Sequence, residues 1–159
     1  MYNLQLSPSA DGLAVNSNYK TNFMKLLLIY MNRFSYKPGI KVLENAEEIK
    51  VGQDFKDIQA AFIHVEKEDE ENIKAVEKKL IKNLKWIAKK NNTNQIILHS
   101  FAHLSESKAE ANVTKELFVR SEERLKDSGY DVYQTPFGWF LDLNLNAPGF
   151  SLARVFKSF

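Results

Sequence analysis

The sequence predicts a single α/β domain in which a mixed β-sheet carries two main helices. Its 159 residues suit one domain, which at this size buries roughly 70% of the surface that the unfolded chain exposes. Short apolar runs of strand length alternate with two long amphipathic segments, a pattern typical of a layered α/β architecture. With 44% hydrophobic and 26% charged residues, the composition is that of a globular chain and excludes a disordered or collagen-like one.

Strands are expected where apolar residues run together between polar ones. The first is Lys25–Tyr30, and a turn-rich stretch follows it, punctuated by Pro38 and Gly39. In the second strand, Gln59–Glu66, alternate side chains are expected on opposite faces of the sheet. Three further strands are expected at Gln95–Phe101, Asp131–Gln134 and Trp139–Leu145.

Two helices are expected between these strands. Over Asn72–Lys90, apolar residues recur at spacings of three and four, and the acidic run Glu66–Glu71 suits the positive end of a helix dipole. The second helix is expected over Glu106–Ser128, with Gly129 as its stop. The outer face of the first helix is expected to be basic, with Glu77 as its one acid. Such a face can bind phosphates but is more often only solvated. Its lysines are Lys74, Lys78, Lys79, Lys82, Lys85, Lys89 and Lys90.

Charge and cysteine content exclude several classes of protein. With 22 Lys+Arg against 20 Asp+Glu, the net charge of +2 does not indicate a nucleic-acid binder, so any such surface must come from local charge separation. The absence of cysteine excludes disulfides, thiolate nucleophiles and Cys-based zinc sites, and it fits a cytoplasmic location. No apolar run approaches the roughly 20 residues of a membrane span, so we expect no membrane partner.

The first 23 residues differ from the rest of the chain. They are polar and lack the basic and apolar regions of a signal peptide. We therefore expect Met1–Phe23 to be an extension and residues 24–159 to form the domain.

Common catalytic motifs are absent from the sequence. It has no GxxxxGK[ST], GxGxxG, HExxH or GxSxG pattern, which argues against a kinase, a P-loop NTPase, a Rossmann dehydrogenase or a zincin. His64 lies within a strand, where a packed, hydrogen-bonded role is expected. His99 and His103 are four apart but belong to a strand and its end rather than to a helix, and no third ligand is near. We predict neither a metal nor a cofactor.

Two places nevertheless indicate a binding site. His103 follows the end of a predicted strand, and ligands of open α/β sheets gather outside the carboxyl ends of strands. An imidazole there can bind a ligand or move a proton, although it could equally cap the next helix. The run Phe137-Gly138-Trp139-Phe140 lets the backbone approach another group closely between aromatic walls, with a plain aromatic core cluster as the alternative.

Together these segments resemble the N-terminal editing domain of archaeal-type threonyl-tRNA synthetases. The resemblance covers nearly all of 24–159 and none of the first 23 residues. It implies a fold like that of D-aminoacyl-tRNA deacylases and hydrolysis of serine wrongly attached to threonine tRNA. The matching motifs, in the order and spacing of the family, are KLLLI (25–29), AAFIHVEK (60–67), FAHLS (101–105) and PFGW (136–139).

The resemblance also implies which residues form the site. His103 corresponds to the histidine at the reacting end of the substrate. The substrate-binding positions implied by the match are Val65, Glu66, Phe101, Ala102, Phe137, Gly138, Trp139 and Phe140.

The sequence departs from the family where polar groups are expected. The family has Tyr-Lys where this chain has Phe140 and Leu141, and leucine cannot donate a hydrogen bond to the reacting ester or water. Another group, such as Lys37 or Lys157, would have to replace that lysine. The family's Leu-Ala-Glu ends here in Arg154, which is expected to reverse a charge at the pocket edge.

Several interpretations therefore stay open. The chain ends at Phe159, where the synthetases continue, so it is either a free-standing protein or a domain cut from a longer one. The polar N-terminal extension, which has no equivalent in the family pattern, favours a free-standing deacylase that acts on aminoacylated tRNA in trans. Alternatives are a non-catalytic member of the family that binds aminoacyl-tRNA, and a partner that docks on a separate threonyl-tRNA synthetase. Homodimerisation is compatible with each.

Overall fold

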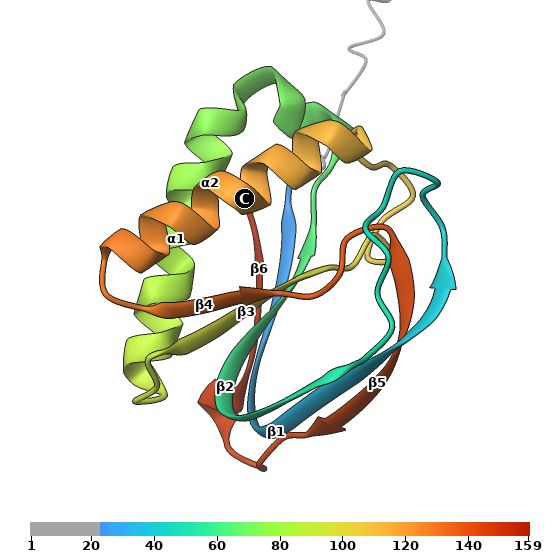
Figure 1. Ribbon diagram of the computed structural model, residues 1–159. Helices are drawn as coiled ribbons and strands as arrows, with labels where there is room; N and C mark the ends of the chain where they lie inside the picture. Colours follow the sequence, from blue (N-terminus) through green and yellow to red (C-terminus); the bar gives the residue numbers. More distant parts are fainter. Residues whose placement is uncertain (1–22) are drawn as a thin grey trace, which may run out of the picture.

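The computed structural model describes residues 23–159, so nearly all of the expected extension Met1–Phe23 lies outside the described residues. Six strands form one curled sheet with the order β4-β3-β2-β1-β5, and β6 also pairs with β1 (Figure 1). The strands are β1 (Lys25–Lys41), β2 (Gln53–His64), β3 (Gln95–Ser100), β4 (Asp131–Gln134), β5 (Trp139–Asn146) and β6 (Arg154–Ser158); the helices are α1 (Ile73–Lys90) and α2 (Ala111–Asp127), with 3₁₀ turns at Lys67–Asn72 and Ser151–Ala153.

Strand β1 organises the sheet. It pairs antiparallel with β2 along one edge, and along the other edge with β6 near its start and β5 near its end. The pairs β2–β3 and β3–β4 are parallel, so the sheet is mixed, as predicted. β1 extends eleven residues beyond its predicted end at Tyr30, because it stays paired with β2 as far as Tyr36 and with β5 as far as Lys41, the latter with a register shift between Pro38 and Ile40. Pairing with β2 has ended at Tyr36, so the proline lies where β1 is an edge on that side.

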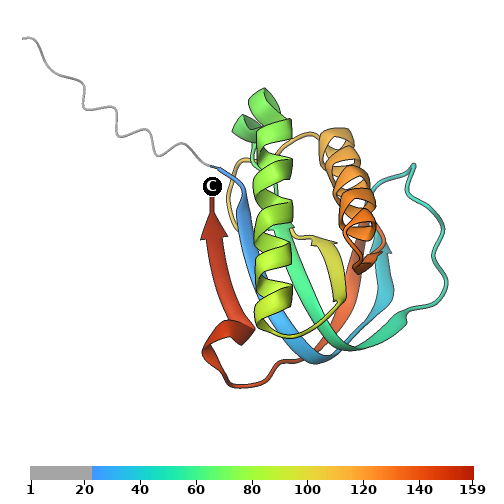
Figure 2. The same ribbon diagram turned by 90° about the vertical axis from the view of Figure 1, so that its left-hand side faces the viewer.

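Both helices cover the same face of the sheet (Figures 1 and 2). The apolar stripe of α1 is buried against β1–β3, with Leu80, Leu84 and Ile87 fully enclosed. The lysines of its outer face are all exposed, as predicted.

Glu77 was expected on the outer face of α1, and this prediction was wrong. This residue is buried between the helices, where Oε2 accepts from Nε of Arg120 at 2.8 Å and Oε1 accepts from Arg124 at 2.7 Å. Burial alone would raise the pKa of Glu77, but the two guanidinium groups outweigh it and hold the pKa below its usual range. The carboxylate therefore joins α1 to α2.

The opposite face of the sheet has an apolar core of its own. It centres on Phe34, Phe55, Ile58 and Phe62, and Leu143 of β5 packs against it because the sheet curls. Within 23–159, no helix is long and apolar enough to cross a membrane.

Candidate functional site

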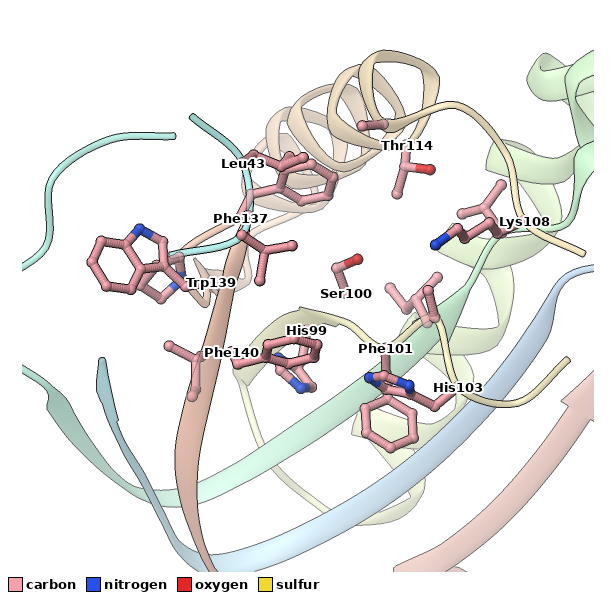
Figure 3. A pocket seen from close by; sticks show the side chains of 18 of the residues that line it. Leu43, His99, Ser100, Phe101, His103, Lys108, Thr114, Phe137, Trp139 and Phe140 are labelled. Atoms are coloured by element: carbon pink, nitrogen blue, oxygen red, sulfur yellow. The ribbon is translucent and has the colours of Figure 1, made fainter. Parts of the chain in front are cut away.

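A pocket of about 500 Å³ opens at the carboxyl ends of β2 and β3 (Figure 3). Because these strands are parallel, both end at the same edge of the sheet, where α/β proteins commonly bind ligands. The walls come from the segment after β1, the ends of β2 and β3, the loop that leads into α2, and the turn before β5. The lining residues that the argument uses are Leu43, Val65, His99, Ser100, Phe101, Ala102, His103, Lys108, Glu110, Thr114, Phe137, Gly138, Trp139, Phe140 and Leu141.

His103 lies in this pocket between two aromatic rings. Its ring centroid is 4.9 Å from that of Phe101, at 72°, and 6.0 Å from that of Phe140, at 23°. Its side chain is exposed, and no hydrogen bond within residues 23–159 engages its nitrogens. The imidazole is therefore held by packing while both nitrogens stay available to a ligand or a water.

The loop that carries His103 is fastened by the buried His64. The backbone N–H of Leu104 donates to its Nδ1 at 3.2 Å, and Nε2 donates to the carbonyl of Ser107 at 2.6 Å. These partners require the tautomer with the proton on Nε2. The packed, hydrogen-bonded role predicted for His64 is confirmed.

The same loop shows why α2 begins five residues later than predicted, at Ala111. The N–H of Ala109 donates to the carbonyl of Val65 at 2.9 Å. This bond and the bonds to His64 hold the preceding residues against the end of β2, outside the helix. These residues, Lys108 and Ala109 among them, form one wall of the pocket.

The opposite wall is tied to the segment after β1. The carbonyl of Gly138 accepts from the N–H groups of Val42 and Leu43 at 2.8 and 3.1 Å, and Nε1 of Trp139 donates to the carbonyl of Glu47 at 3.0 Å. Gly138 has φ +84°, and a Cβ there would lie 2.9 Å from Cβ of Ala46. The close backbone approach expected at this glycine is therefore made by the chain itself.

His99 forms part of the pocket floor. Its Nδ1 lies 2.8 Å from Oγ1 of Thr135, and its ring meets Phe62 edge-on with centroids 5.0 Å apart. Burial, with a smaller contribution from the neighbouring His103, lowers the pKa of His99 to about 4. At neutral pH the floor of the pocket is therefore uncharged at this residue.

Acidification is expected to weaken the fold through His99. In the unfolded chain this imidazole takes up a proton below about pH 6.5, whereas the folded protein resists protonation down to about pH 4. Its stabilising contribution is complete above pH 6.5 and is lost as the pH falls toward 4, with about 2 kcal/mol gone by pH 5. Urea unfolding at pH 7.5 and pH 5 measures this loss. In His99→Asn, which keeps an atom near Nδ1 for Thr135, the difference between the two pH values should shrink; an unchanged difference would contradict the assignment.

The described residues contain no cluster of side chains that could hold a metal ion. Among residues 23–159, no group of three or more His, Asp or Glu side chains is placed to hold an ion. His99 and His103 both line the pocket, but they stand without a third ligand in this part of the chain.

Comparison with known proteins identifies the family. The sequence model of the Archaea-specific editing domain of threonyl-tRNA synthetase matches residues 24–159. The chain belongs to this family. It is 34% identical over 138 residues to the threonine–tRNA ligase of Thermococcus gammatolerans and 33% identical over 139 residues to that of Pyrococcus furiosus. Each match covers 85% of this chain and 22% of the ligase, so the chain spans about a fifth of these relatives.

The predicted fold class is also confirmed. A solved structure of the c-Myc DNA unwinding element binding protein superposes with a TM-score of 0.57 over 84% of this chain and 97% of the other, at 11% identity. At this identity the likeness shows the fold alone. The D-aminoacyl-tRNA deacylase-like fold expected from the sequence is the one observed.

Three of the four segments that carry the editing-family motifs, AAFIHVEK, FAHLS and PFGW, meet at this pocket. Eight of the nine predicted site residues line it: His103, Val65, Phe101, Ala102, Phe137, Gly138, Trp139 and Phe140. Strand β3 ends at one wall and β5 begins at the other, so the curled sheet brings the motifs together.

Glu66 is the exception, because it does not line the pocket. Its side chain is fully buried and paired with Lys25, and its backbone N–H donates to Oδ2 of Asp69 at 2.8 Å. Burial would raise the pKa of Glu66, but the hydrogen bond to Lys25 is among the effects that outweigh it and lower the pKa. Both residues follow the end of β2; Val65 lines the pocket, whereas Glu66, in extended backbone, points away from it to Lys25.

The structure also shows where the residues that depart from the editing-family pattern lie. Leu141 lines the pocket, whereas Arg154 does not: it lies at the start of β6 and donates to the carbonyl of Pro148 at 3.0 Å. The expected charge reversal at the pocket edge was therefore wrong. Neither suggested replacement for the family's lysine lines the pocket; Lys37 lies in register with Asp142, and Lys157 lies over the ring of Trp86.

Sequence reasoning missed several lining residues. Leu43 comes from a segment whose position depends on hydrogen bonds to Gly138, which no local pattern reveals. Ser100 and Lys108 lie within five residues of His103, so their sequence proximity was an available signal. Thr114 lies in the first turn of α2, and its hydroxyl donates to the carbonyl of Glu110 at 3.3 Å.

Proposed function

We propose that the pocket binds the aminoacylated 3′ end of a tRNA and hydrolyses its ester, with seryl-tRNA(Thr) as the substrate. The observation that carries this proposal is that three of the family motifs meet around one open pocket, and that His103 is exposed there. The volume of about 500 Å³ lies in the range of small-molecule sites, and the aromatic rings offer flat surfaces for a nucleoside.

The chemical need for such a site is clear. Serine and threonine differ by one methyl group, a difference worth only about 1–3 kcal/mol in a binding pocket. A second site that admits the smaller side chain and hydrolyses its ester raises fidelity. The reaction requires a positioned water, donors for the developing oxyanion and a wall that excludes the extra methyl. The nitrogens of His103 are free to bind that water or the terminal ribose.

Release of serine from seryl-tRNA(Thr) by the purified chain tests this function. We expect His103→Ala to lower the rate about 100-fold, in the range of a lost proton-transfer or positioning group, and His103→Gln to retain part of it. Thr-tRNA(Thr) serves as the substrate control and should be hydrolysed more slowly. Serine release at the rate of buffer alone would contradict the proposal.

Leu141 favours a second candidate function, a member of the family that binds aminoacyl-tRNA without hydrolysing it. Its side chain packs against the apolar cluster beneath the pocket and offers no donor. In this case a charged tRNA would bind without turnover. A protein of this kind would act beside a threonyl-tRNA synthetase in trans, and co-purification with that enzyme would support it.

A further inference from the structure

Lys108 is a charged pocket residue without a partner among the described residues. Within that part of the chain it is the only lysine or arginine that lines the pocket, and none of the ion pairs found within 23–159 includes it. Its side chain extends into the pocket from the loop side, across from Phe137 (Figure 3). The residue is exposed, and most of the pocket surface beside it is apolar.

The backbone on both sides of Lys108 is fixed. The preceding carbonyl, of Ser107, accepts from Nε2 of His64 at 2.6 Å, and Oγ of Ser107 accepts from the N–H of Lys67 at 3.1 Å. The following N–H, of Ala109, donates to the carbonyl of Val65 at 2.9 Å. Binding a ligand would therefore order only the side-chain torsions of Lys108, which lowers the entropic cost.

Glu110 helps to decide which chemical group the pocket would bind beside Lys108. It lines the same side of the pocket two residues beyond Lys108 and carries the opposite charge. Its Oε1 lies 3.5 Å from Nζ of Lys67 in an exposed ion pair, so an ammonium on the ligand would share this carboxylate with Lys67. An aminoacyl group has a carbonyl oxygen and an ammonium on adjacent carbon atoms, which suits a neighbouring cation and anion. A phosphate would be attracted by Lys108 but repelled by Glu110, so the pair favours the aminoacyl group.

We propose that Lys108 donates a hydrogen bond to the carbonyl oxygen of the bound aminoacyl ester. The identity of this ligand rests on the proposed function. When water adds to the carbonyl carbon, the electron pair of the C=O bond moves to that oxygen, and the ammonium stabilises the charge. Collapse of the intermediate breaks the bond to the ribose oxygen, which takes up the proton that the water loses. Free amino acid and a tRNA with an intact 3′ hydroxyl result.

Binding and turnover by Lys108→Met test the proposal, with Lys115→Met as the matched control. Methionine keeps most of the length of the side chain and removes the charge. Lys115 is an exposed residue of α2 outside the pocket lining. The probes are 3′-(L-serylamino)-3′-deoxyadenosine, in which an amide replaces the ester, together with adenosine and AMP, all titrated into the full chain. Thermal melts of both variants are expected to match the unmodified protein.

We expect Lys108→Met to weaken the serylamino probe about tenfold and to change adenosine and AMP less than twofold. With seryl-tRNA(Thr), KM is expected to rise by up to about tenfold, because the same contact holds the ground-state carbonyl, and kcat is expected to fall about 100-fold further, because the charge on the oxygen grows in the transition state. Weakened AMP binding with an unchanged serylamino probe would overturn the proposal, as would equal behaviour of the two lysine variants.

These results separate the inference from the proposed function. Lys108-dependent binding of the serylamino probe without hydrolysis would remove the hydrolase and keep the contact. Hydrolysis that is insensitive to Lys108→Met would overturn the Lys108 contact and keep the proposed hydrolase. A chain that neither binds the probe nor hydrolyses the ester would overturn both.

Discussion

Replacing His64 with leucine is expected to destabilise the protein by about 3 kcal/mol and to lower activity more than 100-fold. The leucine fills the space of the ring but leaves the N–H of Leu104 and the carbonyl of Ser107 without their partner. Each unsatisfied group costs about 1–3 kcal/mol, less where water reaches it. Activity is expected to fall because the released loop carries both His103 and Lys108.

Two further substitutions, each of which keeps one of the two hydrogen bonds of His64, separate their contributions to stability. In His64→Asn the side-chain oxygen can still accept from Leu104, and in His64→Gln the amide can still donate to Ser107. Each is expected to recover about half of the lost stability, measured by urea unfolding at pH 7.5. If His64→Leu unfolds at the same urea concentration as the unmodified protein, then the loop does not depend on this residue.

Replacing Gly138 with alanine is expected to destabilise the protein by about 3 kcal/mol and to open the wall formed by Phe137 and Trp139. Roughly 1 kcal/mol comes from a side chain at φ +84°. The rest comes from overpacking, because the new Cβ would meet side chains of Leu43 and Ala46 at 3.0 and 2.9 Å. The contacted segment is itself part of the pocket lining, so ligand affinity is expected to fall with stability.

The chain contains matched controls for this substitution. Gly129 has φ +90°, and a Cβ added there would meet nothing within 4 Å, so Gly129→Ala carries the conformational cost alone, about 1 kcal/mol. Gly149 has open space and no positive φ, so Gly149→Ala should change little. Urea unfolding of the three variants separates conformation from crowding. Equal losses in Gly138→Ala and Gly129→Ala would rule out crowding as a cause.

Local sequence patterns predicted much of the scaffold. The helix α1 was placed within one residue of its observed start, since its apolar spacing repeats over five turns and Asn72 caps it by accepting from the N–H of Ala75 at 3.4 Å. The stop at Gly129 was also correct, because its φ of +90° is one that glycine adopts readily. Both features depend on neighbours within a few residues.

Features that depend on distant partners were missed. The strand β6 was not predicted, because its five residues pair only with the first part of β1 and its side chains alternate between exposed and half-buried without a fully buried one. The part of β1 beyond Tyr30 was taken as turns, since Pro38 and Gly39 interrupt its pattern. Pairing with β2 as far as Tyr36 and with β5 as far as Lys41 keeps it extended.

The motif residues and their order along the chain, with His103 after one strand and the aromatic run before another, were evident in the sequence by itself. Tertiary structure alone decided that Glu66 turns away to Lys25, that Glu77 joins the two helices, and that Lys108 enters the pocket. The physical reason is the separation along the chain over which each effect acts, because periodicity and turn chemistry depend on residues only a few positions apart. The direction and charge environment of a side chain depend on hydrogen bonds, such as those of His64, that span forty residues or more.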